Sequence, residues 1–134
     1  MILDKQNLFS SDQAITTTAN STDIIDLGAD NSRVQDLNEK GVTQAFFQVT
    51  KAFTGTTSMV VTLTESDSST MLSETTVVSS ATILTASLVA GYQFQFSTLP
   101  LISKRYLRAT YTVVGTLAAG TIMAGLTLDR QTNV

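Results

Sequence analysis

The sequence predicts an all-β protein, an antiparallel β-sandwich of about eight strands in which a jelly-roll arrangement is favoured. Short segments rich in threonine, valine and aromatic residues recur along the chain, with turn-forming residues between them. Several of these segments alternate apolar and polar residues, which is the period of a half-buried strand. No long segment has the apolar spacing of an amphipathic helix. The chain contains neither cysteine nor tryptophan, so it lacks the residues that mark an antibody-type sandwich.

The first part of the chain predicts two short strands followed by a loop. The strands cover residues 14–19 and 23–28, and a turn-prone Asn-Ser-Thr-Asp segment separates them. Gly28 opens the most polar stretch of the sequence, residues 28–41, which we interpret as a surface loop.

The N-terminal residues have no strand or helix period, but they carry more apolar side chains than a free tail usually does. These side chains are Ile2, Leu3, Leu8 and Phe9. We therefore predict that residues 1–13 form an N-terminal segment that docks on a neighbouring subunit, by adding backbone hydrogen bonds to a sheet edge. Residues 14–134 are then a single β-sandwich domain, which is an ordinary size for one domain.

From residue 42 onward the pattern is strand after strand. The expected strands cover residues 42–53, 58–66, 73–80, 82–88, 92–98, 104–114 and 121–129. The clearest alternation places Tyr92, Phe94 and Phe96 on one face, and we read this aromatic row as the inward face of a core strand rather than a stacking platform for sugars or bases. Pro100 ends that strand because it cannot donate to a ladder. In the next strand, Leu107, Ala109, Tyr111 and Val113 share the face that we expect to be buried.

The composition excludes most catalytic machinery. The chain has no histidine and no cysteine, which rules out a Ser–His–Asp triad, a Cys–His pair and zinc sites built on those ligands. No glycine-rich phosphate-binding motif is present. We predict no catalytic residues, no metal site and no cofactor. Carboxylates remain, and we read Glu65 with Asp67, and Asp23 with Asp26, as solvated loop residues rather than the paired acids of a glycosidase.

Targeting and membrane signals are also missing from the sequence pattern. Asp4 and Lys5 interrupt the N-terminus before an apolar signal-peptide region forms. No apolar run approaches the ~20 residues that a spanning helix needs. We expect a protein that is made in a cytoplasm and does not contact a membrane.

Three of the eight basic residues gather at one place, Lys104, Arg105 and Arg108, on and beside the polar face of the 104–114 strand. The net charge of −3 is opposite to that of a nucleic-acid-binding domain. Residues 1–40 carry seven acidic and three basic side chains. We therefore expect the basic cluster to bind acidic groups on another protein or on a second copy of this chain.

Three segments carry a resemblance to a known family. They are MILDKQNLFSSDQAITTTANSTDIIDLG (1–28), LVAGYQFQFSTLP (88–100) and KRYLRATYTVVGTLAAGTIMAGLTLD (104–129). In order and spacing they resemble the capsid cement, or decoration, proteins of tailed bacteriophages. Residues 28–44 and 65–74 match that family less well, so the resemblance assigns no role to them.

The resemblance implies a jelly-roll protein that is not an enzyme. It would bind the outer surface of the icosahedral head in the virion, bridge subunits of the major capsid protein and stabilise the shell, as a dimer or trimer made in the host bacterial cytoplasm. It implies no direct contact with nucleic acid. The alternatives are another virion β-sandwich component, such as a head–tail connector or tail protein, or a carbohydrate-binding module. A glycosidase that uses carboxylates alone is a third alternative.

Overall fold

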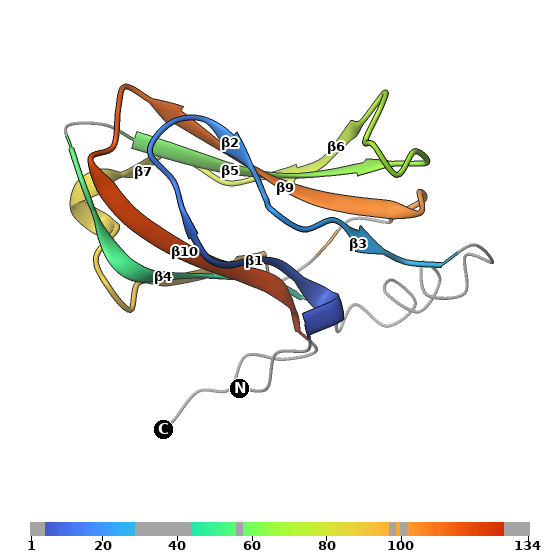
Figure 1. Ribbon diagram of the computed structural model, residues 1–134, viewed down its shortest axis with the longest axis horizontal. Coiled ribbons are helices and arrows are strands. Elements are labelled where there is room, and N and C mark those ends of the chain that lie inside the picture. The colour runs from blue at the N-terminus through green and yellow to red at the C-terminus, as the bar shows by residue number, and fades with distance from the viewer. Residues whose placement is uncertain (1–4, 29–43, 56–57, 97–98, 100–101, 128–134) are drawn as a thin grey trace.

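The computed structural model describes residues 5–28, 44–55, 58–96, 99 and 102–127. Over these residues the chain is an all-β sandwich of two antiparallel sheets, which confirms the predicted fold class (Figure 1). The strands are β1 Leu8–Ala14, β2 Ala19–Asn20, β3 Ile25–Asp26, β4 Gln44–Thr54, β5 Ser58–Ser66, β6 Thr75–Ser79, β7 Ile83–Leu84, β8 Gln93–Phe96, β9 Tyr106–Val114 and β10 Ala119–Thr127. Two single 3₁₀ turns, η1 Lys5–Asn7 and η2 Thr85–Ser87, accompany them. No helix in the described part of the chain is long and apolar enough to cross a membrane.

The strand order has the wiring of a jelly roll. The first sheet has the order β1-β10-β4-β8, and the second has the order β2-β9-β5-β6. β3 also pairs with β9 beyond β2, and β7 also pairs with β5, so the second sheet has four strand positions in space. The chain changes sheet at every connection except those from β2 to β3 and from β5 through β6 to β7. This winding places the first and last strands side by side, as in a jelly roll.

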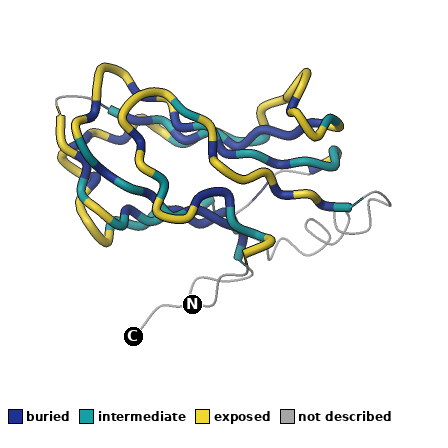
Figure 2. The backbone as a smooth tube through the Cα atoms, in the orientation of Figure 1, coloured by how far each residue is buried: buried dark blue, intermediate teal, exposed yellow. Residues whose placement is uncertain are grey.

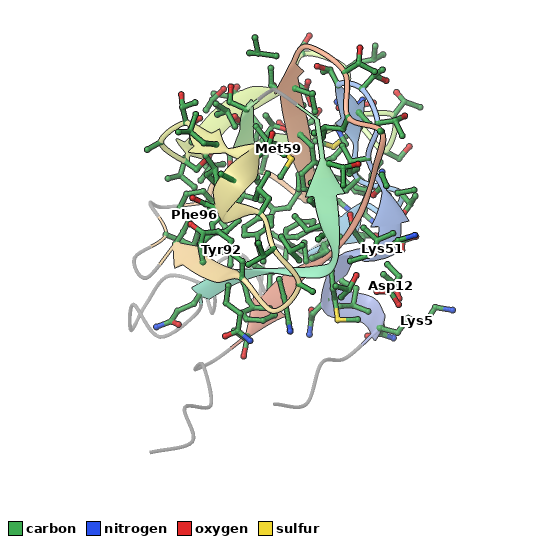
Figure 3. All side chains as sticks on the ribbon, turned by 90° about the vertical axis from the view of Figure 1, so that its left-hand side faces the viewer. Lys5, Asp12, Lys51, Met59, Tyr92 and Phe96 are labelled. Atoms are coloured by element: carbon green, nitrogen blue, oxygen red, sulfur yellow. The ribbon has the colours of Figure 1, made fainter. Side chains whose placement is uncertain are left out.

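The core lies between the sheets and follows the predicted alternation. On β9 the side chains of Leu107, Ala109, Tyr111 and Val113 are buried, as expected from the sequence. Met59, the first of the inward residues of β5, lies between the two sheets in Figure 3. Figure 2 shows the same pattern along the backbone, with most of the exposed positions in the connections.

A pair of hydroxyl groups, from Ser10 and Tyr111, is enclosed by the sandwich. The Tyr111 hydroxyl lies 2.7 Å from the Ser10 hydroxyl, and the Ser10 hydroxyl also donates to the side-chain oxygen of Gln13 at 2.6 Å. Burial raises the pKa of Tyr111 well above its usual range, and the hydrogen bond with Ser10 opposes this shift weakly. The hydroxyl pair therefore joins the edge strand β1 to the middle of the second sheet in a neutral form.

The aromatic row faces inward, as predicted. The rings of Phe94 and Phe47 stack with centroids 4.9 Å apart, and Phe96 meets Phe47 edge-on at 5.7 Å. Tyr92 is 6.0 Å from Phe94, and all three members of the row pack against the buried core. Because these rings are used in packing, they do not form an open stacking platform.

The N-terminal prediction needs a correction. The strand expected at residues 14–19 instead runs from Leu8 to Ala14 and pairs with β10. Its register shifts twice, and Asp12 has a φ of 48°, so the strand is bulged. A bulge inserts extra residues and breaks the two-residue alternation, which hides such a strand from a sequence reading. The expected domain boundary between residues 13 and 14 thus falls inside β1.

Two other expected elements differ in extent. The strand predicted at 23–28 is reduced to Ile25–Asp26, and the strand predicted at 82–88 is reduced to Ile83–Leu84, which the η2 turn follows. Both short strands pair at the end of a longer neighbour, β9 or β5. The remaining expected strands are present within a few residues of their predicted bounds. The loop predicted at 28–41 lies outside the described residues except for Gly28.

Candidate interaction surface

The predicted basic cluster lies at one end of the second sheet. Lys104 and Arg105 directly precede β9, and Arg108 is on its outer face. The outer faces of β9 and β5 are otherwise dominated by hydroxyl groups that are bonded across the strands. Thr62 bonds to Ser79 at 3.0 Å, and Thr110 donates to the side-chain oxygen of Asn20 at 3.0 Å. This face is therefore polar but carries few charges.

Arg105 is paired within its own chain. Its Nε and Nη2 atoms donate to the two carboxylate oxygens of Asp26 at 2.8 and 2.9 Å, a two-pronged ion pair between β3 and the start of β9. The guanidinium carbon also lies 5.0 Å from the centre of the Tyr106 ring. The hydrogen bonds to Asp26 raise the pKa of Arg105. Both side chains are more than one third exposed, so solvent screens the pair.

Arg108 is held more firmly. Its Nη2 atom donates to Glu74 at 2.5 Å, and the same carboxylate oxygen accepts from the Thr64 hydroxyl at 3.0 Å. The Arg108 side chain is only 16% exposed, and its Nε is buried without a partner among the described residues. This network joins β9, β5 and the residue that directly precedes β6. Arg108 is therefore part of the framework rather than an open cation.

Lys104 has the freest charge of the three. Its ammonium group donates to the Thr75 hydroxyl at 3.1 Å and forms no salt bridge within the part of the chain that the structure describes. Its backbone N–H donates to Glu65 at 3.3 Å, and the same carboxylate accepts the Ser103 N–H at 2.9 Å and the Ser103 hydroxyl at 3.0 Å. The connection into β9 is thus fixed to the end of β5.

The acidic residues considered as catalytic pairs have separate roles. Glu65 is buried, at 7% exposure, and binds the 103–104 backbone, so its interpretation as a solvated loop carboxylate is wrong. Asp67 is exposed in the following turn. Asp26 pairs with Arg105, whereas Asp23 is exposed ahead of β3. Within the described ranges, no group of three potential metal-ligating side chains gathers.

These contacts change the interpretation of the basic cluster. Two of its three cations meet carboxylates of the same chain, and one of those carboxylates, Asp26, belongs to the acidic first forty residues. The expected charge complementarity therefore exists inside one molecule. Pairing of the cluster with another protein stays a prediction. Lys104 is the residue best placed for it, because it forms no salt bridge among the described residues.

The proposed N-terminal docking residues divide into three cases. Ile2 and Leu3 lie outside the described residues. Phe9 is fully buried in the core of its own chain, so its assignment as a partner-binding residue is wrong, because no partner can reach its side chain. Leu8 is half-buried and packs against Gly125 of β10. The contact is close, because a β-carbon added to Gly125 would lie 3.0 Å from the Leu8 side chain.

A different apolar side chain is displayed. Leu72, in the loop between β5 and β6, is 70% exposed, more than Ile24, Leu84, Val89 or Val114. The sequence predicts no role for this loop, because residues 65–74 match the capsid cement proteins less well. An available signal was the apolar Met71–Leu72 pair inside the otherwise polar segment 65–74.

Comparison with protein families places the chain. The model of the Bbp16 family matches residues 9–126, from β1 to β10, and the chain therefore belongs to the Bbp16 family. No curated protein matches the sequence.

Proposed function

We propose that this member of the Bbp16 family is a capsid cement protein of a tailed bacteriophage. It binds the outer surface of the head, bridges neighbouring subunits of the major capsid protein and stabilises the shell, without enzymatic activity. The observation that carries the proposal is the ordered resemblance of residues 1–28, 88–100 and 104–129 to that class of protein. The last of these segments contains β9 and β10, each of which lies between two strand positions of its sheet.

The surface chemistry supports a structural role. Charged residues make up 14% of the chain, against about 25% for an average soluble domain. Hydroxyl groups on the outer face of the second sheet are hydrogen-bonded within the chain, as Thr62 is to Ser79 and Thr110 is to Asn20. A surface with few charges loses little hydration energy when a large neutral protein surface covers it.

In a lattice of many copies, each single contact needs less affinity than an isolated contact would. Every copy on a shell is held near its neighbours, so weak contacts add through high effective concentration. A small dimer or trimer that bridges capsid subunits therefore needs only modest affinity at each site. Weak contacts of this kind favour a role at high copy number over a role at a single vertex.

The copy number tests the proposal. We would purify the particles that contain this chain and measure its molar ratio to the major capsid protein by quantitative mass spectrometry. The proposal predicts a ratio near one or a simple fraction of one. A few copies per particle would instead assign the chain to the connector or tail, and its absence from particles would contradict a virion role.

A further inference from the structure

Leu72 stands out because of its backbone as well as its exposure. Isolated exposed aliphatic residues are common on protein surfaces and need no explanation. However, the residues on both sides of Leu72 have left-handed backbone angles, with φ of 59° at Met71 and 53° at Ser73. Glycine is the residue that adopts this conformation without strain. The chain instead uses two side-chain-bearing residues, and such strain is typically concentrated at functional contacts.

Several contacts hold the loop in this strained form. The Ser66 hydroxyl, at the buried end of β5, donates to the Leu72 carbonyl at 2.6 Å and accepts the Ser68 N–H at 3.1 Å. The Met71 N–H donates to the Ser68 carbonyl at 2.9 Å, and the Met71 side chain is buried. The loop is thereby fixed to β5 from within.

The far end of the loop is fixed as well. Glu74 is bound by Thr64 of β5 and by Arg108 of β9, directly after the strained Ser73. Figure 1 shows the loop standing out from the second sheet beyond the end of β5, and Figure 2 shows that much of it is exposed. Met71 points inward and Leu72 outward, so the hydrogen bonds present Leu72 in one orientation before any partner arrives.

We propose that the 67–74 loop is a preformed contact element in which Leu72 inserts into an apolar pocket on the partner protein. Under the proposed function, on which this inference rests, that partner is the protein of the shell surface. Preorganisation lowers the entropy lost on binding, and buried anchors at the centre of an interface carry most of its affinity. The same loop also carries the hydroxyl residues Ser68, Ser69 and Thr70, of which Ser69 and Thr70 are exposed, and polar residues of this kind are typical of the rim of a protein interface.

The chemistry of this contact differs from that of a charge-driven one. The nearest basic side chain in the network, Arg108, is already neutralised by Glu74. An apolar anchor is insensitive to ionic strength, whereas exposed charge pairs weaken as salt is added. Salt dependence therefore distinguishes the Leu72 contact from binding through Lys104 and Arg105.

The chain offers a matched control for Leu72. Leu84 is the same residue type with a similar exposure of 63%. Its partner in the sheet is Ser58, at the start of β5, whereas the Leu72 loop follows Ser66 at the other end. The two leucines are thus separated by the length of β5, about 26 Å. If binding depended only on the overall hydrophobicity of the surface, replacing either leucine by serine would weaken it equally.

The test is rebinding of purified protein to heads produced without it, measured as occupancy against concentration. We expect Leu72→Ser to weaken binding at least about tenfold, with Leu72→Met and Leu84→Ser close to the wild type. We also expect the wild-type affinity to change less than about threefold between roughly 50 and 500 mM NaCl. Circular dichroism should show unchanged melting for all three variants, because both leucines are exposed.

The outcomes separate this inference from the function on which it rests. Wild-type binding with an undiminished Leu72→Ser variant would overturn the Leu72 contact and leave the cement role standing. Equal losses for Leu72→Ser and Leu84→Ser would overturn it as well, because the effect would not be local. Failure of the wild-type protein to bind the heads at all would overturn both.

Discussion

Two segments of this protein place apolar residues in polar sequence, and the fold treats them in opposite ways. In β1 the Phe9 side chain is fully enclosed by the sandwich. In the loop between β5 and β6 the Leu72 side chain is 70% exposed. Phe9 belongs to a strand that pairs with β10 and faces the other sheet, whereas Leu72 lies beyond the last paired residue of β5. Apolar content alone therefore does not decide burial, since Met71 is buried in the same loop that exposes Leu72.

Both segments also contain strained backbone, with different consequences. In β1 the left-handed Asp12 accompanies a bulge on an edge strand, and it carries an exposed charge. Bulges and charges on edge strands hinder pairing with other chains. In the 67–74 loop the strained Met71 and Ser73 flank an exposed leucine. The strained Asp12 position thus disfavours pairing with other chains, whereas the strained loop, by our proposal, contacts one.

The largest expected effect concerns Phe9. Phe9→Ala removes a fully buried aromatic ring from the core, and the lost burial plus the cavity cost should lower the free energy of unfolding by about 3–5 kcal/mol. Urea denaturation followed by circular dichroism measures this. Leu72→Ala is the control and should change stability by less than about 0.5 kcal/mol. A stable Phe9→Ala variant that fails to bind heads would restore the docking role for this residue.

Ser66→Ala tests how the loop is held. The change removes the buried hydroxyl that bonds to the Leu72 carbonyl and to the Ser68 N–H, and should cost about 1–3 kcal/mol because buried partners lose a hydrogen bond. Hydrogen exchange should speed up at the Met71 amide. Ser69→Ala, at an exposed position of the same loop, is the matched control. Unchanged exchange in Ser66→Ala would show that the loop does not depend on this hydroxyl.

Tyr111 makes the stability of the enclosed region depend on pH. Burial raises the pKa of Tyr111 in the folded protein, so the folded state keeps its proton more tightly than the unfolded state does. The associated stability is fully present below the unfolded tyrosine pKa of about 10 and is lost as the pH rises above it. As the pH rises from roughly 9.5 to 11.5, the denaturation midpoint of the wild type should therefore fall faster than that of Tyr111→Phe. Parallel curves for the two proteins would contradict this account.

The smallest effect is expected from Arg105. Its pair with Asp26 is two-pronged but exposed, so Arg105→Ser should shift the melting temperature by no more than about 2 °C. Arg108→Ser should shift it further, because the Arg108 side chain is less exposed and its partner Glu74 also anchors the loop. Differential scanning fluorimetry at low and high salt measures both. A larger loss for Arg105→Ser would show that the exposed pair is structurally more important than its solvation suggests.

The sequence was sufficient for elements whose alternation is regular. The inward row of β9 and the Tyr92–Phe96 row follow directly from a two-residue period. The sequence does not predict β1 because two register shifts, between Leu8 and Ser10 and between Ser10 and Gln13, break that period. Lys104 and Arg105 precede β9 and Arg108 lies on its outer face, but the sequence does not predict which carboxylates pair with Arg105 and Arg108. Asp26 and Glu74 reach the two arginines only through the register of β3 and the turn before β6, which depend on tertiary pairing.

Leu72 illustrates the same limit. Nothing in a run of serine, threonine and acidic residues fixes which of Met71 and Leu72 turns inward. That choice follows from two left-handed backbone positions and from the Ser66 hydroxyl, which are properties of the folded loop. Similarity to a family in the framework strands gives no information about such a loop. Loops on rigid scaffolds nevertheless commonly carry function.

The most direct measurement is photo-crosslinking in assembled particles, with a benzophenone amino acid placed at position 72 in one sample and at position 84 in another. The two native residues are exposed leucines at opposite ends of β5. Our account predicts a crosslink to the major capsid protein from position 72 and little or none from position 84. Crosslinks from position 84 alone, or from neither position in particles that contain the protein, would contradict the assignment of this loop as the contact element.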